Sequence, residues 1–340
     1  MSPAWGCDVR QVGQLPSEVL SRLDRQLNRV RDETGVPGFI LAVAQGKRTV
    51  LVRGYGTQDG RPLEPTLPAM LCSLCKPLTA QAFLLLADEG KLTLDDPAAR
   101  WLPIDPAITL RHLLTHRSGL AAKFPEGSRA PSEAEHVKLA LREPLAFAPG
   151  TAFLYSNVGY QALGRILEAL TGERPDRFLQ RRILDPLGIK SYFVATYLPP
   201  DQQRRYDSGV LPYLTPQRWD KATGQYVAVR DRIARLAQEA PGSADTSGAG
   251  CMSAPDYLTF LLSLPPRQRQ LIRKSAVEGY GLGWMLRDGG LAHTGIGSGE
   301  THYALTRDNG LSLVCFIPSS DDTACEKVLE SVKSAVKYIP

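Results

Sequence analysis

Strand-like segments at the two ends of the chain enclose a helical middle, and this order constrains the fold more than any other feature. Near the N-terminus, residues 38–56 (GFILAVAQGKRTVLVRGYG) hold two apolar runs around a Gln-Gly-Lys turn at 45–47, which predicts a β-hairpin. From Tyr280 onward, short apolar segments separated by Gly and Asn-Gly turns predict further strands, followed by a helix at about 321–337. We therefore expect a mixed α/β (α+β) fold in which both termini build one sheet and a helical lobe is inserted between its halves.

Regular apolar spacing and end-favouring residues mark the helices of the middle region. One helix is predicted over Leu20–Thr34, and another over KPLTAQAFLLLADEG, which reaches Gly90. In TLRHLLTHRSG, Thr109 is the expected N-cap and Gly119 the expected end. The segment NVGYQALGRILEALTG is expected to end at Gly172.

These segments suggest two lobes that act as a single catalytic unit. Residues 1–70 and 250–340 are expected to form the sheet lobe, and residues 71–249 a mainly helical lobe. Within the second lobe, residues 194–249 are the least regular part of the sequence. We interpret them as a surface insertion that covers a site.

Composition and charge narrow the class of partner. The chain has 340 residues, of which 43% are hydrophobic and 22% charged, as in an ordinary globular protein. Its net charge of +5 is not gathered into a basic run, so neither nucleic acid nor an anionic membrane is the expected partner. The N-terminal sequence lacks the apolar core of a secretory signal, and a cytoplasmic location with reduced cysteines is expected. The oligomeric state stays open.

The stretch LCSLCKPLTA (71–80) offers two kinds of chemistry. Cys72 and Cys75 have the spacing of a redox pair, but the preceding RPLEPTLPAM is too rich in proline for the central strand that a thioredoxin-like site follows. No second Cys/His pair with zinc spacing is present, and no cofactor is expected. The alternative is Ser73 with Lys76, which share one helix face at i and i+3.

A serine hydroxyl needs a neighbouring base to become a nucleophile. A free lysine has a pKa of about 10.4, so Lys76 must be desolvated or lie near another cation to act as that base. Ser73 would sit at the positive end of a helix, which favours an alkoxide. A second match, Ser334-x-x-Lys337 in the C-terminal helix, is expected to be solvated surface.

Two further elements supply groups that such a serine needs. Tyr155-Ser156-Asn157 offers a phenol that can move a proton and an amide that can donate to a carbonyl. The segment His293-Thr294-Gly295 offers open backbone N–H groups suited to the edge of a cleft. Taken singly, each also fits a structural role, as a packed turn tyrosine and a glycine-rich hairpin edge.

Their order along the chain resembles that of the serine β-lactamase and penicillin-binding-protein superfamily. The Tyr-x-Asn form is similar to the class C-like branch, which includes β-lactamases, D-alanyl-D-alanine carboxypeptidases, D-aminopeptidases, family VIII esterases and acyltransferases. Segments that resemble family landmarks lie along nearly the whole chain: KLTLDDPAARWLP, ITLRHLLTHRSGL, FAPGTAFLYSNVGYQALGRILEALTG, LDPLGI, GAGCMSAPDYLTFL and YGLGWML. The resemblance implies a β-lactamase-like fold, with an antiparallel sheet and flanking helices beside an all-helical lobe, and a site in the groove between them.

The resemblance also implies a role for each matching residue. Ser73 becomes the acylated nucleophile, Lys76 its proton partner and Tyr155 the general base, with His293 opposite Tyr155 to tune its proton. The expected substrate-binding groups are Asn157, Thr294, Gly295 and Ile296, whose N–H would form an oxyanion hole with that of Ser73.

The leading interpretation is a serine hydrolase or acyltransferase that acts on a small ester or amide. A histidine at 293, where β-lactamases and carboxypeptidases more often carry lysine, is familiar among esterase-like members and argues against penicillins as natural substrates. β-Lactamase or D-amino-acid peptidase activity is the alternative within the enzyme class. A catalytically silent ligand-binding relative is the alternative outside it.

Other residues are weaker candidates. His112 and His116 have zinc-helix spacing but lack the accompanying Glu, so helix packing is the preferred interpretation. Trp284, and with it Tyr213 and Trp219, are candidates to line an acyl pocket, although aromatic residues more often lie in the core.

Overall fold

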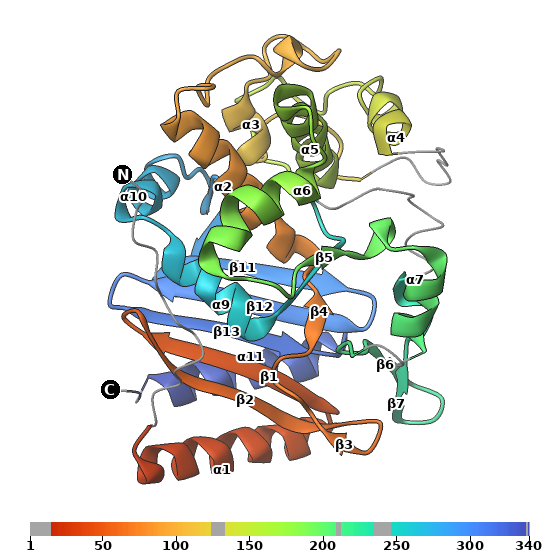
Figure 1. Cartoon of the computed structure of the whole chain (residues 1–340), viewed down its shortest axis with the longest axis vertical. Coiled ribbons are helices and arrows are strands. Elements are labelled where there is room, and N and C mark those ends of the chain that lie inside the picture. Colours follow the sequence, from red (N-terminus) through yellow and green to blue (C-terminus); the bar gives the residue numbers. More distant parts are fainter. Residues whose placement is uncertain (1–14, 124–132, 209–211, 234–245, 338, 340) are drawn as a thin grey trace.

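The computed structural model describes residues 15–123, 133–208, 212–233, 246–337 and 339, and Figure 1 shows a sheet between helical layers. Eight strands of the described residues form one antiparallel sheet. In spatial order they are β3 (Arg61–Pro62), β2 (Arg48–Gln58), β1 (Gly38–Gln45), β13 (Leu311–Ile317), β12 (Glu300–Arg307), β11 (Gly290–Gly297), β10 (Trp284–Arg287) and β9 (Tyr280–Gly281). N-terminal β1 pairs directly with C-terminal β13, with Ala42 opposite Val314. The prediction of one sheet built from both termini is confirmed.

Helices cover both faces of this sheet, which is why β1 is almost wholly buried. Successive strand side chains point to opposite faces. Leu41 and Val43 therefore pack in the cluster formed with α1 (Ser17–Thr34) and α11 (Asp322–Val336). Ile40 and Ala42 belong to the other cluster, toward α9 (Ala254–Ser263) and the helical lobe.

The helical lobe lies above the second face of the sheet in Figure 1. Its helices are α2 (Cys75–Asp88), α3 (Leu110–Leu114), α4 (Glu133–Ala140), α5 (Asn157–Thr171) and α6 (Pro175–Leu179), and α10 (Pro266–Lys274) follows α9. The short element η2 (Ala98–Arg100) lies between α2 and α3, and η3 (Gln180–Leu184) and η4 (Asp185–Leu187) follow α6. A small sheet of β4 (Pro68–Met70), β8 (Gly250–Ser253) and β5 (Phe193–Val194) lies beside the lobe. Among the residues that the structure describes, none of the helices is both long and apolar enough to cross a membrane.

Several helices begin or end at the capping residues that the sequence predicts. Helix α5 begins after the N-cap Ser156, whose side chain accepts from Gly159 N–H, and ends at Gly172 in the left-handed conformation. Thr109 caps α3 and shares a capping box with His112, whose ring nitrogen accepts from Thr109 N–H. His112 thus serves the helix end.

One expectation is corrected. Helix α3 ends at Leu114 rather than Gly119, because the chain turns at His116 (φ +58°), so His112 and His116 do not share a helix face. The described part of the segment 194–249 contains a few short regular elements. Its described residues include η5 (Ala195–Tyr197), α7 (Pro200–Asp207) and the hairpin β6 (Gln217–Asp220) with β7 (Gln225–Ala228).

Candidate active site

Ser73 lies in the 3-10 turn η1 (Cys72–Leu74), which joins β4 to the first turn of α2. The turn is anchored because Leu71 N–H donates to the Gly250 carbonyl of β8 at 2.7 Å. Cys72 has a φ of +49°, a left-handed conformation that costs a non-glycine residue about 1 kcal/mol or more. This turn holds Ser73, which is half-buried, at the start of α2.

Strand β11 passes directly beside this turn, and glycine at 295 makes the approach possible. A Cβ atom on Gly295 would lie 2.3 Å from the Leu71 carbonyl oxygen. Any larger residue would force β11 and the Ser73 turn apart. The residue type at 295 therefore positions the strand edge against the serine.

The two cysteines that flank Ser73 are buried. Both are free thiols, and burial raises the pKa of Cys72 well above its ordinary value. The Cys72 thiol donates to Glu300 Oε1 at 3.4 Å. Because the thiolate is the reactive form, this environment opposes thiol chemistry at Cys72.

Lys76 is fully buried and points its amine at Ser73. Its Nζ donates to Ser73 Oγ at 3.0 Å, to Asn157 Oδ1 at 2.8 Å and to the Ser247 carbonyl at 3.0 Å. All three acceptors are neutral, and burial lowers the pKa of Lys76 to about 7. The amine is thus near half neutral at pH 7, which is the condition that a lysine base requires.

Tyr155 and Asn157 reach the same point from the start of α5. Lys76 Nζ lies 4.9 Å from the centre of the Tyr155 ring. Burial raises the pKa of Tyr155 above its ordinary value, while a hydrogen bond with Ser73 opposes the shift. The phenol is therefore neutral at pH 7. Asn157 accepts from Lys76 through Oδ1, which leaves its Nδ2 hydrogens for another partner.

His116, for which helix packing was expected, holds the backbone on both sides of Tyr155. Its carbonyl accepts from Leu154 N–H at 2.9 Å, and its Nδ1 accepts from Ser156 N–H at 3.0 Å. The imidazole also packs on the Tyr155 ring, with centroids 4.2 Å apart. Burial lowers the pKa of His116 well below its ordinary value, so Nδ1 stays an acceptor. His116 and Ser156 are 40 residues apart, so no local sequence pattern predicts this contact.

His293 is buried and hydrogen-bonded to a tyrosine that the sequence analysis missed. Its Nδ1–H donates to the Thr294 carbonyl at 2.7 Å, so Nε2 accepts from the Tyr280 hydroxyl at 3.0 Å. Burial and, to a smaller extent, the nearby charge of Lys76 lower the pKa of His293 to about 3. The His293 and Tyr155 rings lie 6.4 Å apart, and Tyr280 packs against both. His293 therefore contributes no charge at neutral pH.

An open cavity of about 390 Å³ lies over Ser73. Its lining residues come from the end of β4, η1, the chain after α3, the start of α5, strand β11 and the segment 194–249: Met70, Cys72, Ser73, Lys123, Asn157, Gln161, Arg232, Ser247, Gly248 and Ile296. Ile296 is 59% exposed, and its neighbours Thr294 and Gly295 continue the same strand edge. The structure thus brings together every residue on the predicted site except one.

That exception is Trp284, which is 1% exposed and stacks in the core against Phe260. Its burial excludes it from the lining of the cavity. Tyr213 is likewise buried, whereas Trp219 is exposed and packs on Tyr226 in the β6–β7 hairpin. Aromatic residue type alone did not distinguish core from pocket.

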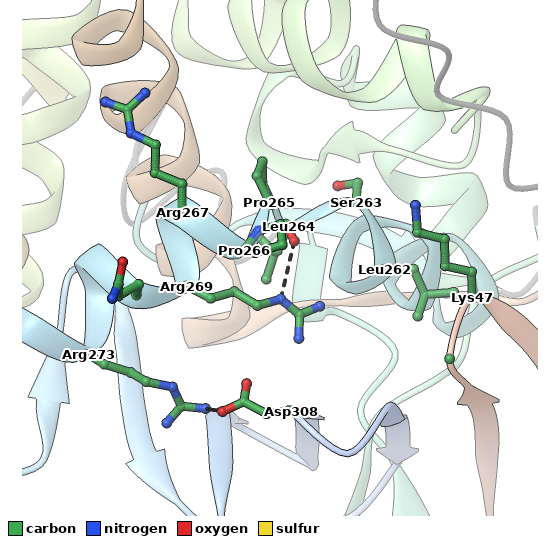
Figure 2. Close-up of a pocket in the computed structure, with 12 residues that line it drawn as sticks. Lys47, Leu262, Ser263, Leu264, Pro265, Pro266, Arg267, Arg269, Arg273 and Asp308 are labelled. Carbon is green, nitrogen blue, oxygen red and sulfur yellow. Dashed lines mark hydrogen bonds and ion pairs between the residues drawn. The ribbon is translucent and has the colours of Figure 1, made fainter.

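Two other features lie apart from this site. The second Ser-x-x-Lys match is exposed at the end of α11, as predicted, at Ser334 and Lys337. A larger pocket of about 830 Å³ lies between the α9–α10 connection and the turns at Lys47 and Asp308, and Figure 2 shows its arginine side chains. It contains none of the predicted site residues. Within the described ranges, no three His, Cys, Asp or Glu side chains are grouped to hold a metal ion.

Comparison with known proteins agrees with this geometry. The sequence profile of the beta-lactamase family matches residues 23–328, so the chain belongs to that family. Esterase EstB of Burkholderia gladioli is 28% identical over 284 residues, which are 72% of this chain and 70% of EstB. AmpH of Escherichia coli (strain K12), a D-alanyl-D-alanine carboxypeptidase/endopeptidase, is 30% identical over 54% of this chain and 51% of its own length.

The fold is also that of solved relatives. The structure of EstCE1, described as a hydrolase with promiscuous acyltransferase activity, superposes with a TM-score of 0.77 over 94% of this chain and 98% of EstCE1, at 19% identity. Similarity at that level concerns the fold alone. The β-lactamase-like architecture is therefore established, with an antiparallel sheet and flanking helices.

Proposed function

We propose that the protein is a serine hydrolase that forms an acyl-enzyme on Ser73 and acts on a small ester or amide. The observation that carries this proposal is the 3.0 Å contact between Lys76 Nζ and Ser73 Oγ at the floor of an open cavity. The amine has no carboxylate partner among the described residues, and burial lowers its pKa to about 7. Membership of a family that includes EstB and AmpH supports the same reaction class.

In the proposed acylation step, neutral Lys76 takes the proton of Ser73 as the serine oxygen attacks the substrate carbonyl. The backbone N–H groups of Ser73 and Ile296 would stabilise the resulting oxyanion. The Asn157 Nδ2 hydrogens, which Lys76 does not use, would donate to the acyl side of the substrate.

Tyr155 takes a different role here from the one its sequence motif suggests. Its pKa is raised by burial, so a neutral phenol is better suited to give a proton to the leaving group than to remove one from Ser73. Lys76 would then return a proton to Tyr155. Water, or an alcohol in acyl transfer, would release the acyl group with Lys76 or Tyr155 again handling its proton.

Esterase activity is preferred over β-lactamase activity because of His293. This residue is buried and neutral, so strand β11 supplies no cation for a substrate carboxylate at position 293, where β-lactamases more often carry lysine. EstB, a relative matched over 70% of its length, is an esterase. Cleavage of D-amino-acid peptides stays the alternative, because AmpH shares the family.

A labelling experiment tests the proposal. A fluorophosphonate probe is expected to modify the wild-type protein but not Ser73→Ala, and p-nitrophenyl acetate turnover should fall with it. Ser334→Ala is the matched control, because Ser334 carries the same Ser-x-x-Lys spacing on the surface of α11. Absence of labelling in every form would favour a silent binding protein, and labelling of Ser73→Ala would place the nucleophile elsewhere.

A further inference from the structure

Two cationic side chains line the cavity over Ser73 and are not used by the proposed reaction. Arg232 comes from the segment 194–249, and Lys123 from the chain that follows α3. No acidic side chain lines the cavity within the described residues. We propose that Arg232 and Lys123 form an anion subsite, so that the preferred ester or amide carries a carboxylate. This inference rests on the proposed function of Ser73.

Arg232 is held in a fixed position by a buried carboxylate. Its Nε and Nη2 lie 3.3 and 3.4 Å from Glu300 Oε1, and the Glu300 side chain is only 2% exposed. The same oxygen accepts from the thiol of Cys72, the residue before Ser73. This chain of contacts fixes the guanidinium close to the turn that carries the serine.

The Glu300 contact leaves donors of Arg232 available for a ligand. A guanidinium has five N–H groups in a rigid fork, and the two contacts to Glu300 use only part of it. Arg232 keeps 15% of its side chain exposed, while Glu300 lies behind it. A planar carboxylate with two oxygens matches the remaining donors. Glu300 thus supports the position of Arg232 without filling the cavity.

Lys123 provides a second, flexible cation on the same cavity. It is exposed, and it forms no ion pair with any carboxylate that the structure describes. The other basic groups near Ser73 do not supply this charge. His293 is neutral, and Lys76 directs its amine to three oxygens of the protein. The cavity therefore attracts anions mainly through Lys123 and Arg232.

The size of the cavity fits a small molecule with a short acid chain. A volume of about 390 Å³ lies in the range of small-ligand sites. Exposed Ile296 supplies an apolar contact for the carbon chain on the strand side. A half-ester of a dicarboxylic acid combines a scissile ester, a short apolar chain and a terminal carboxylate.

The test compares substrates that differ only in that charge. The p-nitrophenyl half-ester of adipic acid is measured beside its methyl ester, and 4-acetoxybenzoate beside its methyl ester. The first pair carries the carboxylate on the acyl side and the second on the leaving group. Each kcat/KM is measured at low and high salt, because a charge-based preference weakens as salt rises.

The variants separate the subsite from folding and from general charge. Lys123→Met removes an exposed cation. Arg232→Met is combined with Glu300→Gln, because removing the arginine alone leaves a buried carboxylate without its partner. Lys91→Met, at an exposed lysine beyond the end of α2, is the matched control.

We expect the wild type to prefer the carboxylate in at least one pair, by roughly tenfold or more. That preference, taken as the ratio of kcat/KM for the charged ester to kcat/KM for its methyl ester in the same variant, should fall severalfold in Lys123→Met and in the double variant. Equal rates on charged and neutral esters in the wild type, or a preference unchanged by the variants, would overturn the inference while leaving the Ser73 reaction intact. No turnover of any ester, together with no fluorophosphonate labelling, would instead refute the proposed function and the subsite with it.

Discussion

The low pKa of Lys76 predicts the pH dependence of the reaction. A lysine with its ordinary pKa of 10.5 has about one part in 10³ to 10⁴ of the neutral amine at pH 7, whereas a pKa of about 7 leaves about half of it neutral. The buried site therefore raises the supply of base by about 10³-fold. This gain comes from burial among neutral oxygens and not from a second cation.

We expect kcat/KM for a neutral ester to rise about tenfold per pH unit below 7 and to level off above it. At pH 5 the value should be about 1% of the plateau, because only about that fraction of Lys76 is neutral two units below its pKa. The assay is p-nitrophenyl acetate hydrolysis from pH 5 to 9.5, corrected for spontaneous hydrolysis, with circular dichroism to confirm that the fold persists.

The same profile separates Lys76 from Tyr155 as the base. Burial raises the pKa of Tyr155, so a reaction that needs its phenolate would keep accelerating beyond pH 9. Lys76→Arg is the matched control, because a guanidinium keeps the positive charge and cannot lose its proton in this range. A plateau that begins well above pH 8, or a Lys76→Arg variant with the wild-type profile, would refute the reasoning.

Three further substitutions test the framework around the serine. Gly295→Ala places a Cβ 2.3 Å from the Leu71 carbonyl oxygen, so β11 must move by about 1 Å. We expect kcat to drop by about 10²-fold. A normal kcat would show that the position of this strand edge is not critical. His116→Asn keeps an acceptor for Ser156 N–H and should retain more activity than His116→Ala, with the difference in kcat rather than KM. Arg232→Met alone should lower the free energy of unfolding, measured by urea titration, by about 3–5 kcal/mol. Adding Glu300→Gln should recover part of that loss. Equal stability of the single and double variants would contradict the role given to the ion pair.

The order of elements along the chain was predictable because it depends on local signals. The Gly-containing turn at 45–47 and the N-cap Ser156 each act on neighbouring residues, and the structure has them as expected. The pairing of β1 with β13 joins residues some 270 positions apart, but it followed from apolar strand patterns at both ends. The predicted end of α3 at Gly119 was wrong by five residues, because the helix ends at Leu114 and Gly119 lies in a later turn.

Some features of the candidate site could be predicted from the sequence, and others could not. The spacing of Ser73 and Lys76 on one turn is a property of the sequence, since residues three apart on a helix share a face. The order of the Tyr155 and His293 motifs along the chain can also be read directly from the sequence. Whether an aromatic residue lines a pocket does not, and Trp284 was misplaced for that reason.

The sequence by itself determined which groups are available for chemistry, because residue type and helical spacing are local. Only the tertiary structure decided their protonation and their partners. The amine of Lys76 loses its proton readily because distant segments bury it among neutral oxygens, and His116 orients Tyr155 through contacts across about 40 residues. Desolvation and non-local hydrogen bonds arise only when those segments pack together, so spacing along the chain carries no record of them.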